Sequence, residues 1–268
     1  MRDHTGLIRS LVADSALGPL RGLLLTLTVV TGVVDAVSIL ALGRVFVANM
    51  TGNVVFAAFA LVGAPGFSLS ASLFALAGFL VGAYGGGVLI GRFGHDRGLL
   101  LRAGGAVELA FAAVALVVAA TSGDQGVTHG TIGLAGGVFG AAVTDAIAAL
   151  LATALGVQNA VARKLAVPDL TTTVLTMTLT GVGADIRAIF GDRPRTKARG
   201  AARSALGRRL LAVAAMVIGA VAGASLALRV SPLSGLALAT ALLTVVTAWI
   251  ALATRRPAGW RAFPAAQH

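Results

Sequence analysis

A few short polar side chains stand out in a chain that is otherwise strongly apolar. Carboxylate, amide and hydroxyl groups among apolar residues can bind an ion or a small polar solute, or can satisfy the backbone where a helix is interrupted. They gather once in each half of the chain, and we expect substrate-binding residues among them. The candidates are Asp35, Asn49, Thr51, Asn53, Gln158, Asn159, Asp169, Thr171 and Thr172.

Asp35 lies about fifteen residues into an apolar segment, past the middle of a membrane if that segment spans one. A carboxylate at that depth costs several kcal/mol unless it is paired, hydrated or protonated, so Asp35 predicts an ion- or proton-coupled role. The alternative is a protonated Asp35 that caps broken backbone near Asn49 or Thr51. Glu108 and Asp145 raise the same question, and for them interhelical hydrogen bonding is an equal explanation.

The run Asn49-Met50-Thr51-Gly52-Asn53 places three short polar side chains around a glycine. Such residues bond their own backbone and favour turns, so the run predicts a helix break whose freed backbone groups bind an ion or solute. The alternative is that the side chains only repair the break. The same two interpretations apply to Asp169-Leu170-Thr171-Thr172, where Pro168 fits the first turn of a helix. Gln158 and Asn159 are expected polar partners of that region.

No enzyme, metal or cofactor site is expected. The chain has no cysteine, which excludes disulfides and thiolate metal sites, and its four histidines show no metal-ligand spacing. No nucleophile lies in a known arrangement with a base. The glycines at 82, 85 and 86 lie inside an apolar segment without a following Lys-Ser or Lys-Thr, so they predict close helix packing and not a phosphate loop. Gly219 and Gly223 are interpreted in the same way.

Composition points to the membrane. Hydrophobic residues make up 57% of the chain, charged residues 12%, and the mean hydropathy is +0.92. A soluble domain carries roughly twice that charged fraction, and lipid is the solvent in which so much apolar surface can face outward. The net charge of +11 is interpreted as an orientation signal that meets anionic headgroups, not as a nucleic-acid surface. The expected partners are the lipid bilayer and a small polar solute or ion, with the oligomeric state left open.

Eight apolar segments follow one another. A spanning helix needs about 20 apolar residues, which six of them supply, while the second and sixth are shorter and contain the polar clusters. The approximate ranges of the eight segments are 21–43, 45–63, 69–91, 99–121, 132–156, 167–184, 206–228 and 233–253.

Charge favours six spans over eight. If the second and sixth segments do not cross, both termini and the basic stretches, among them the predicted loop Asp185–Arg209, all fall on the cytoplasmic side. Arg44 and Arg229 remain exceptions. The expected organisation is a cytoplasmic segment at 1–19, one transmembrane domain at 20–253 and a cytoplasmic tail at 254–268.

The two halves of the membrane domain resemble each other. The stretch from Gly32 matches that from Gly156, and the run from Asn49 matches that from Asp169. The stretch from Gly82 through Arg92 matches the one from Gly219 through Arg229. Asp145-Ala146 competes as the partner of Asp35-Ala36. Six helices in two halves, 20–121 and 132–253, predict an inverted repeat, which is common among secondary transporters.

Three stretches carry a resemblance to a family: Gly32-x-x-Asp35-Ala36, residues 45–53 (Val-Phe-Val-Ala-Asn-Met-Thr-Gly-Asn), and Gly156-x-Gln158-Asn159-Ala160. The chain resembles the YoaK-type family of bacterial integral membrane proteins, a domain of unknown function (1275), over roughly residues 20–253. The resemblance implies a multi-pass protein of the bacterial inner membrane with about six helices. It implies no particular substrate or activity.

The sequence thus predicts an all-α polytopic membrane protein with about six transmembrane helices, two short or broken helices and an internal inverted repeat. The expected function is that of a transporter or channel for a small polar solute or ion. A non-transporting membrane protein (a sensor, a structural partner or an intramembrane enzyme) is the alternative. A polar cavity at mid-depth, lined from both halves, would distinguish the two.

Overall fold

The computed structural model describes residues 17–122, 138–167, 175–190, 196–255 and 258–263. Among these residues, every element of regular secondary structure longer than a single bridge is a helix, as predicted. The helices are α2 (Leu20–Ala41), α3 (Met50–Leu61), α4 (Leu69–Phe93), α5 (Arg97–Thr121), α6 (Ala141–Leu165), α7 (Leu175–Phe190), α8 (Thr196–Arg229), α9 (Pro232–Ala253) and the 3-10 turn η1 (Gly259–Arg261).

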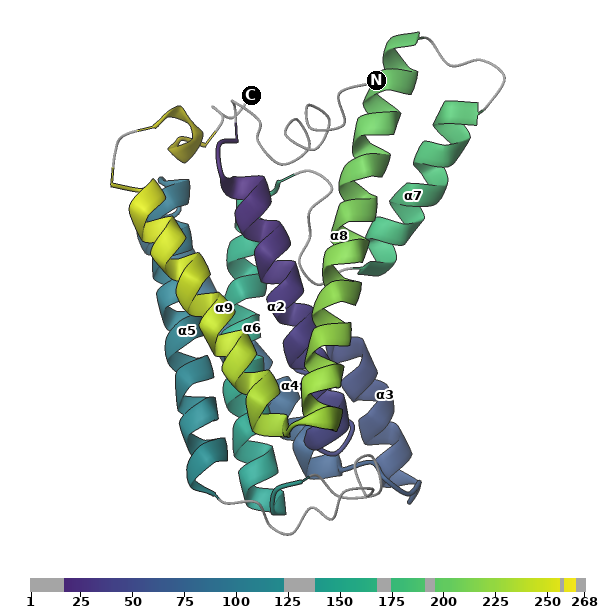
Figure 1. Ribbon diagram of the computed structural model, residues 1–268, viewed down its shortest axis with the longest axis vertical. Helices are drawn as coiled ribbons and strands as arrows, with labels where there is room; N and C mark the ends of the chain where they lie inside the picture. The colour runs from purple at the N-terminus through teal and green to yellow at the C-terminus, as the bar shows by residue number, and fades with distance from the viewer. Residues whose placement is uncertain (1–16, 123–137, 168–174, 191–195, 256–257, 264–268) are drawn as a thin grey trace.

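Six of the described helices (α2, α4, α5, α6, α8 and α9) are long and apolar enough to cross a membrane, which confirms the predicted number. They run side by side along the long axis of the molecule (Figure 1). The other two, α3 with 12 residues and α7 with 16, are short. They lie at opposite ends of the bundle, α3 at the lower right and α7 at the upper right of Figure 1.

Glycine lets two pairs of long helices approach closely. A side chain at Gly82 of α4 would overlap the carbonyl of Thr153 in α6, and one at Gly156 of α6 would overlap the carbonyl of Phe79 in α4. Small residues of this kind are what bring helix backbones together in lipid. The interpretation of Gly82 as a packing residue is confirmed, whereas a Cβ at Gly85 would meet nothing within 4 Å.

The second close pair is α2 with α8. A side chain at Gly32 would overlap the carbonyl of Met216, and one at Gly219 would overlap the carbonyl of Val29. A Cβ at Gly223 would lie 2.6 Å from the carbonyl oxygen of Val33. The α2–α8 and α4–α6 contacts are the largest between helices, and both are built on glycine.

The fifth predicted segment, 132–156, is displaced along the chain. Its helix, α6, runs from Ala141 to Leu165 and carries Arg163 and Lys164, predicted in a loop, in its last turn. Gln158 and Asn159 therefore lie within the helix. Hydropathy ended the segment too early because these polar groups face protein, and because basic side chains near a helix C-terminus interact well with its dipole.

The prediction of a loop over Asp185–Arg209 is wrong for its described residues, which are helical. Asp185 lies in α7 and Arg209 in α8, and their side chains form an ion pair with Nη1 2.6 Å from Oδ2. Alanine, arginine and lysine are strong helix formers, so a polar stretch rich in them extends α8 beyond its apolar part.

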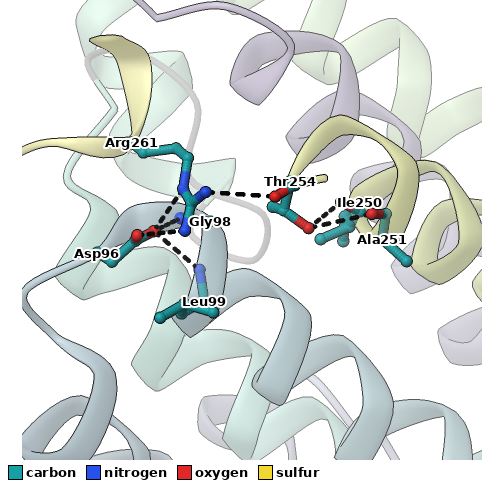
Figure 2. Close-up of polar contacts among 7 residues, drawn as sticks. All are labelled: Asp96, Gly98, Leu99, Ile250, Ala251, Thr254 and Arg261. Carbon is teal, nitrogen blue, oxygen red and sulfur yellow. Dashed lines mark hydrogen bonds and ion pairs between the residues drawn. The ribbon is translucent and has the colours of Figure 1, made fainter. Parts of the chain in front are cut away.

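The C-terminal segment is tied to the turn between α4 and α5 (Figure 2). Asp96 caps α5 by accepting from the amides of Gly98 and Leu99 at 2.8 and 3.0 Å. Arg261 of η1 donates to both Asp96 oxygens, at 3.1 and 2.5 Å, and to the carbonyl of Thr254 at 3.2 Å. The start of α5 and the end of α9 therefore lie at one end of the bundle.

Electrostatics favours the charged form of both members of this pair. Burial acts to raise the pKa of the Asp96 carboxyl, but the hydrogen bonds from Arg261 and the amide of Leu99 outweigh it and hold the pKa below its ordinary value. The hydrogen bond to Asp96 raises the pKa of Arg261.

Candidate solute cavity

The chain is not helical between α2 and α3, and Asp35 of α2 satisfies part of that break. Its Oδ1 accepts from the backbone amides of Val47 and Ala48 at 3.2 and 3.1 Å, while the side chain is nearly buried, at 6% exposure. Unpaired amides at membrane depth cost several kcal/mol each, so these bonds stabilise the broken segment. The interpretation of Asp35 as a cap is thus supported for Oδ1. The other oxygen, Oδ2, makes no hydrogen bond to the described residues.

Asn53 repairs the break in the same way. Its Oδ1 accepts from the amide of Phe46 at 2.8 Å, and its Nδ2 donates to the carbonyl of Phe46 at 2.6 Å. The residue is fully buried. Both ends of the amide are therefore engaged with backbone, and Asn53 is a structural residue.

An open cavity of about 430 Å³ lies beside the break. Small-molecule sites range over roughly 300–1,000 Å³, so its size suits a small solute. Thr31 and Asp35 of α2 and Asn49 at the start of α3 supply polar groups, within walls that are mainly apolar. Met216 and Ala220 of α8 also line the cavity. Both halves of the chain therefore line it.

The described candidates of the second half, Gln158 and Asn159, do not line this cavity. Gln158 of α6 donates from Nε2 to the hydroxyl of Thr31 at 3.1 Å, and that hydroxyl donates to the carbonyl of Leu27 at 3.0 Å. Asn159 donates to the carbonyl of Leu155, in its own helix, at 2.9 Å. The candidates Asp169, Thr171 and Thr172 lie outside the described residues. The first residue after that stretch, Leu175, lines the cavity.

The described polar candidates of the two halves do not form one site. Asn53 faces the break and α3 packs on α4, whereas Gln158 lies against α2. Thr51 is exposed and does not line the cavity. Of the sequence candidates, the structure brings Asp35 and Asn49 to a common cavity.

Thr31 was missed by sequence reasoning, although a signal was present. It precedes Asp35 by four residues, so the two lie on the same face of α2. Thr31 both lines the cavity and accepts the hydrogen bond from Gln158, and so links α6 to the cavity wall.

The other intramembrane carboxyl groups differ from each other. Asp145 of α6 accepts a hydrogen bond from Ser70 of α4 at 3.2 Å, which is the interhelical bond predicted as one alternative. Glu108 of α5 is 1% exposed, and its Oε1 has no partner among the described residues. No group of three or more potential metal-ligand side chains occurs in the described part of the chain.

Comparison with known proteins identifies relatives of unknown function. The family described as "Protein of unknown function (DUF1275)" matches residues 23–249. The chain is 30% identical over 202 residues to the UPF0700 transmembrane protein YoaK of Bacillus subtilis (strain 168), and the alignment covers 74% of this chain and 82% of that protein. No solved structure matches the chain.

Proposed function

This chain belongs to the DUF1275 family of proteins of unknown function, and from that premise we propose that it moves a small polar solute or ion across the bacterial inner membrane. It acts as a transporter or channel and not as an enzyme. One observation carries the proposal: the open cavity of about 430 Å³ beside the non-helical stretch between α2 and α3, with Asp35 in its wall.

Asp35 is suited to recognise a cation or a hydrogen-bond donor. Its Oδ1 is occupied by two backbone amides, which hold the carboxyl group in place, while Oδ2 has no bond to the described residues. A carboxyl group fixed in this way at a cavity wall can bind a solute through its second oxygen. Asn49 and Thr31 add an amide and a hydroxyl group to the same wall.

An inverted repeat is part of the proposal. Exchanging α2, α3, α4 and α5 with α6, α7, α8 and α9 converts the α2–α8 contact into α6–α4, α3–α4 into α7–α8, and α5–α6 into α9–α2, and all of these contacts occur. The glycines aligned in the sequence lie at the matching contacts, Gly32 near Gly219 and Gly156 near Gly82. Repeats of this kind place a solute site where interrupted helices meet.

A second candidate function is a non-transporting membrane protein, and the repaired break favours it. Asn53 is fully engaged with backbone and Asp35 is engaged in part, as expected if these side chains serve only to stabilise the fold. The two functions differ in what they require of the Asp35 carboxyl group.

Substitutions at Asp35 separate the two functions. Asp35→Asn keeps an oxygen that accepts from Val47 and Ala48 but removes the ionisable group, whereas Asp35→Leu removes both. We expect Asp35→Asn to abolish uptake while the melting temperature stays close to that of the wild type. Asp35→Leu should also lower the melting temperature, because each amide left unpaired costs about 1–3 kcal/mol.

The measurement is uptake into liposomes with a panel of small polar solutes and monovalent cations, with and without a proton gradient. Thr51→Ala, at an exposed position away from the cavity, is the matched control and should transport normally. Wild-type uptake of none of the panel, or full uptake by Asp35→Asn, would contradict the proposed role.

A further inference from the structure

Glu108 occupies a second, much smaller cavity in the interior of the bundle. It lies near the middle of α5, and the cavity of about 10 Å³ is lined by α2, α5, α6 and α9. That volume is about the minimum that holds one water molecule. The Oε1 atom of Glu108 is buried and has no hydrogen-bond partner among the described residues.

Among the described residues that line this cavity, no cationic side chain compensates Glu108. The residues that α2, α6 and α9 contribute to this cavity include no titratable side chain, and Tyr84 and Arg92 of α4 do not line it. Thr247 of α9 donates to the carbonyl of Gly105. An ionised carboxylate buried without a partner costs several kcal/mol or more, so this environment favours the neutral acid. The neutral acid carries a hydroxyl group that needs an acceptor.

Gln158 offers an acceptor in the same cavity. It lines the same cavity, and its Oε1 is buried without a donor among the described residues. Its Nε2 is already used, since it donates to Thr31 in the wall of the open cavity. Gln158 thus lines the small cavity together with Glu108 and bonds Thr31 in the wall of the open one.

We propose that Glu108 is a proton-binding site whose proton sets the orientation of the Gln158 amide. With the proton bound, the Glu108 hydroxyl donates to Oε1 of Gln158, directly or through one water molecule, and Nε2 donates to Thr31. When Glu108 releases its proton to water, it becomes a carboxylate, which can only accept hydrogen bonds. The amide then turns so that Nε2 donates to Glu108, and the Thr31 hydroxyl donates to Oε1 of Gln158 instead of to the carbonyl of Leu27.

The two arrangements differ at the wall of the open cavity, because Thr31 lies one helical turn from Asp35 on that wall. The reorientation of the Gln158 amide would be the coupling step of transport, with the proton as the coupling ion, and in that role it rests on the function proposed above. The proton site itself does not depend on transport.

Infrared difference spectroscopy tests the site on the full chain in lipid nanodiscs, between acid and alkaline buffers. We expect a C=O stretching band of a protonated carboxyl group that Glu108→Gln abolishes and Asp35→Asn retains. Gln158→Leu should move the band to higher frequency, because it removes the hydrogen-bond acceptor. Glu108→Ala is a second variant in case the first does not fold, and the retention volume of each variant on a sizing column reports its folding.

The outcomes are distinct. A band that persists in folded Glu108→Gln would overturn the proton site, as would its absence from the wild type at every pH. An unchanged band in Gln158→Leu would overturn the link to Gln158. A band lost in Glu108→Gln, together with wild-type protein that takes up none of the solute panel, would support the proton site and reject transport.

Discussion

At the scale of single residues, the polar side chains at the α2–α3 break serve the backbone first. Asp35 and Asn53 both bond to the short stretch from Phe46 to Ala48. Water is absent from the hydrocarbon region, so only side chains or other backbone can satisfy such a stretch. The non-helical stretch between α2 and α3 therefore depends on one residue from each of the two helices that flank it.

Replacing Asn53 by leucine should destabilise the protein, although Asn53 itself does not line the cavity. The substitution leaves both the amide and the carbonyl of Phe46 unpaired, at about 1–3 kcal/mol for each group. We expect a clearly lower melting temperature in nanodiscs. Thr51→Ala, two residues away and exposed, should change the free energy of unfolding by no more than about 0.5 kcal/mol. Equal stability of the two variants would show that the break does not need Asn53.

At the scale of elements, the bundle is held by helix pairs in which glycine faces the backbone of the neighbouring helix. The α4–α6 pair shows this most clearly, since Gly82 and Gly156 lie against each other and against neighbouring carbonyls. Without glycine the two axes would have to separate, and the dispersion contacts along both helices would weaken.

Alanine at Gly82 and at Gly85 should have effects of opposite sign. A Cβ at Gly82 overlaps the carbonyl of Thr153, and overpacking of this kind costs about 1–3 kcal/mol. At Gly85, where nothing lies within 4 Å, alanine is the better helix former by up to about 1 kcal/mol. Chemical unfolding of the purified variants measures both. Destabilisation of equal size at both positions would contradict the packing described for α4 and α6.

The link between η1 and α5 should depend on pH. The pKa of Asp96 is lower in the folded protein than its ordinary value of about 3.9, so its contribution to stability is complete above that value. The contribution is lost as the pH falls through the lowered pKa of the folded state. The free energies of unfolding of the wild type and Asp96→Asn should be measured from neutral pH downward. We expect the difference between them to narrow only in strong acid.

Asp96→Asn also separates the ion pair from the helix cap. Asparagine caps a helix about as well as aspartate, so this variant keeps the cap but loses the charge and one of the two acceptor oxygens that face Arg261. Asp96→Ala loses the cap as well and should be less stable than Asp96→Asn by about 1 kcal/mol. If the two variants unfold alike, the hydrogen bonds to Gly98 and Leu99 contribute nothing measurable.

At the scale of the whole molecule, basic residues gather at one end of the bundle. That end holds the start of α5, the end of α9 and α7 (Figure 1). The opposite end carries Arg44 after α2 and Arg229 at the end of α8, the two exceptions expected from the sequence. Excess lysine and arginine mark the side that is not translocated.

We therefore expect the end that holds Arg97 and η1 to face the cytoplasm. A reporter fused after Ala253 should be active only in its cytoplasmic form, and one inserted in the Arg229–Pro232 turn only in its periplasmic form. The reverse pattern at both sites would show that the protein has the opposite orientation in the membrane. A cytoplasmic signal from both sites would be incompatible with α9 crossing the membrane.

The sequence alone determined what depends on local composition. Six long apolar stretches predicted six spanning helices, and the glycines at 82 and 219 predicted close packing. The polar run from Asn49 predicted an interruption at 49–53, but the non-helical stretch lies at 42–49, and residues 50–53 form the first turn of α3. These predictions follow from the solvent, because lipid demands long apolar helices and tolerates interruptions only where polar groups repair them. The boundaries of α6 and the helical nature of 185–209 did not follow, since hydropathy cannot separate a polar residue in a loop from one in a protein-facing helix.

Only the tertiary structure decided which polar groups meet. Asn53 bonds Phe46 before its own helix, whereas Gln158 bonds Thr31 of a different helix. Glu108 and Gln158 line one cavity because α2, α5, α6 and α9 enclose it, and none of these helices forms it alone. Such contacts depend on helix rotation and crossing, which packing of whole faces sets, and the spacing of polar residues along the chain carries no record of them.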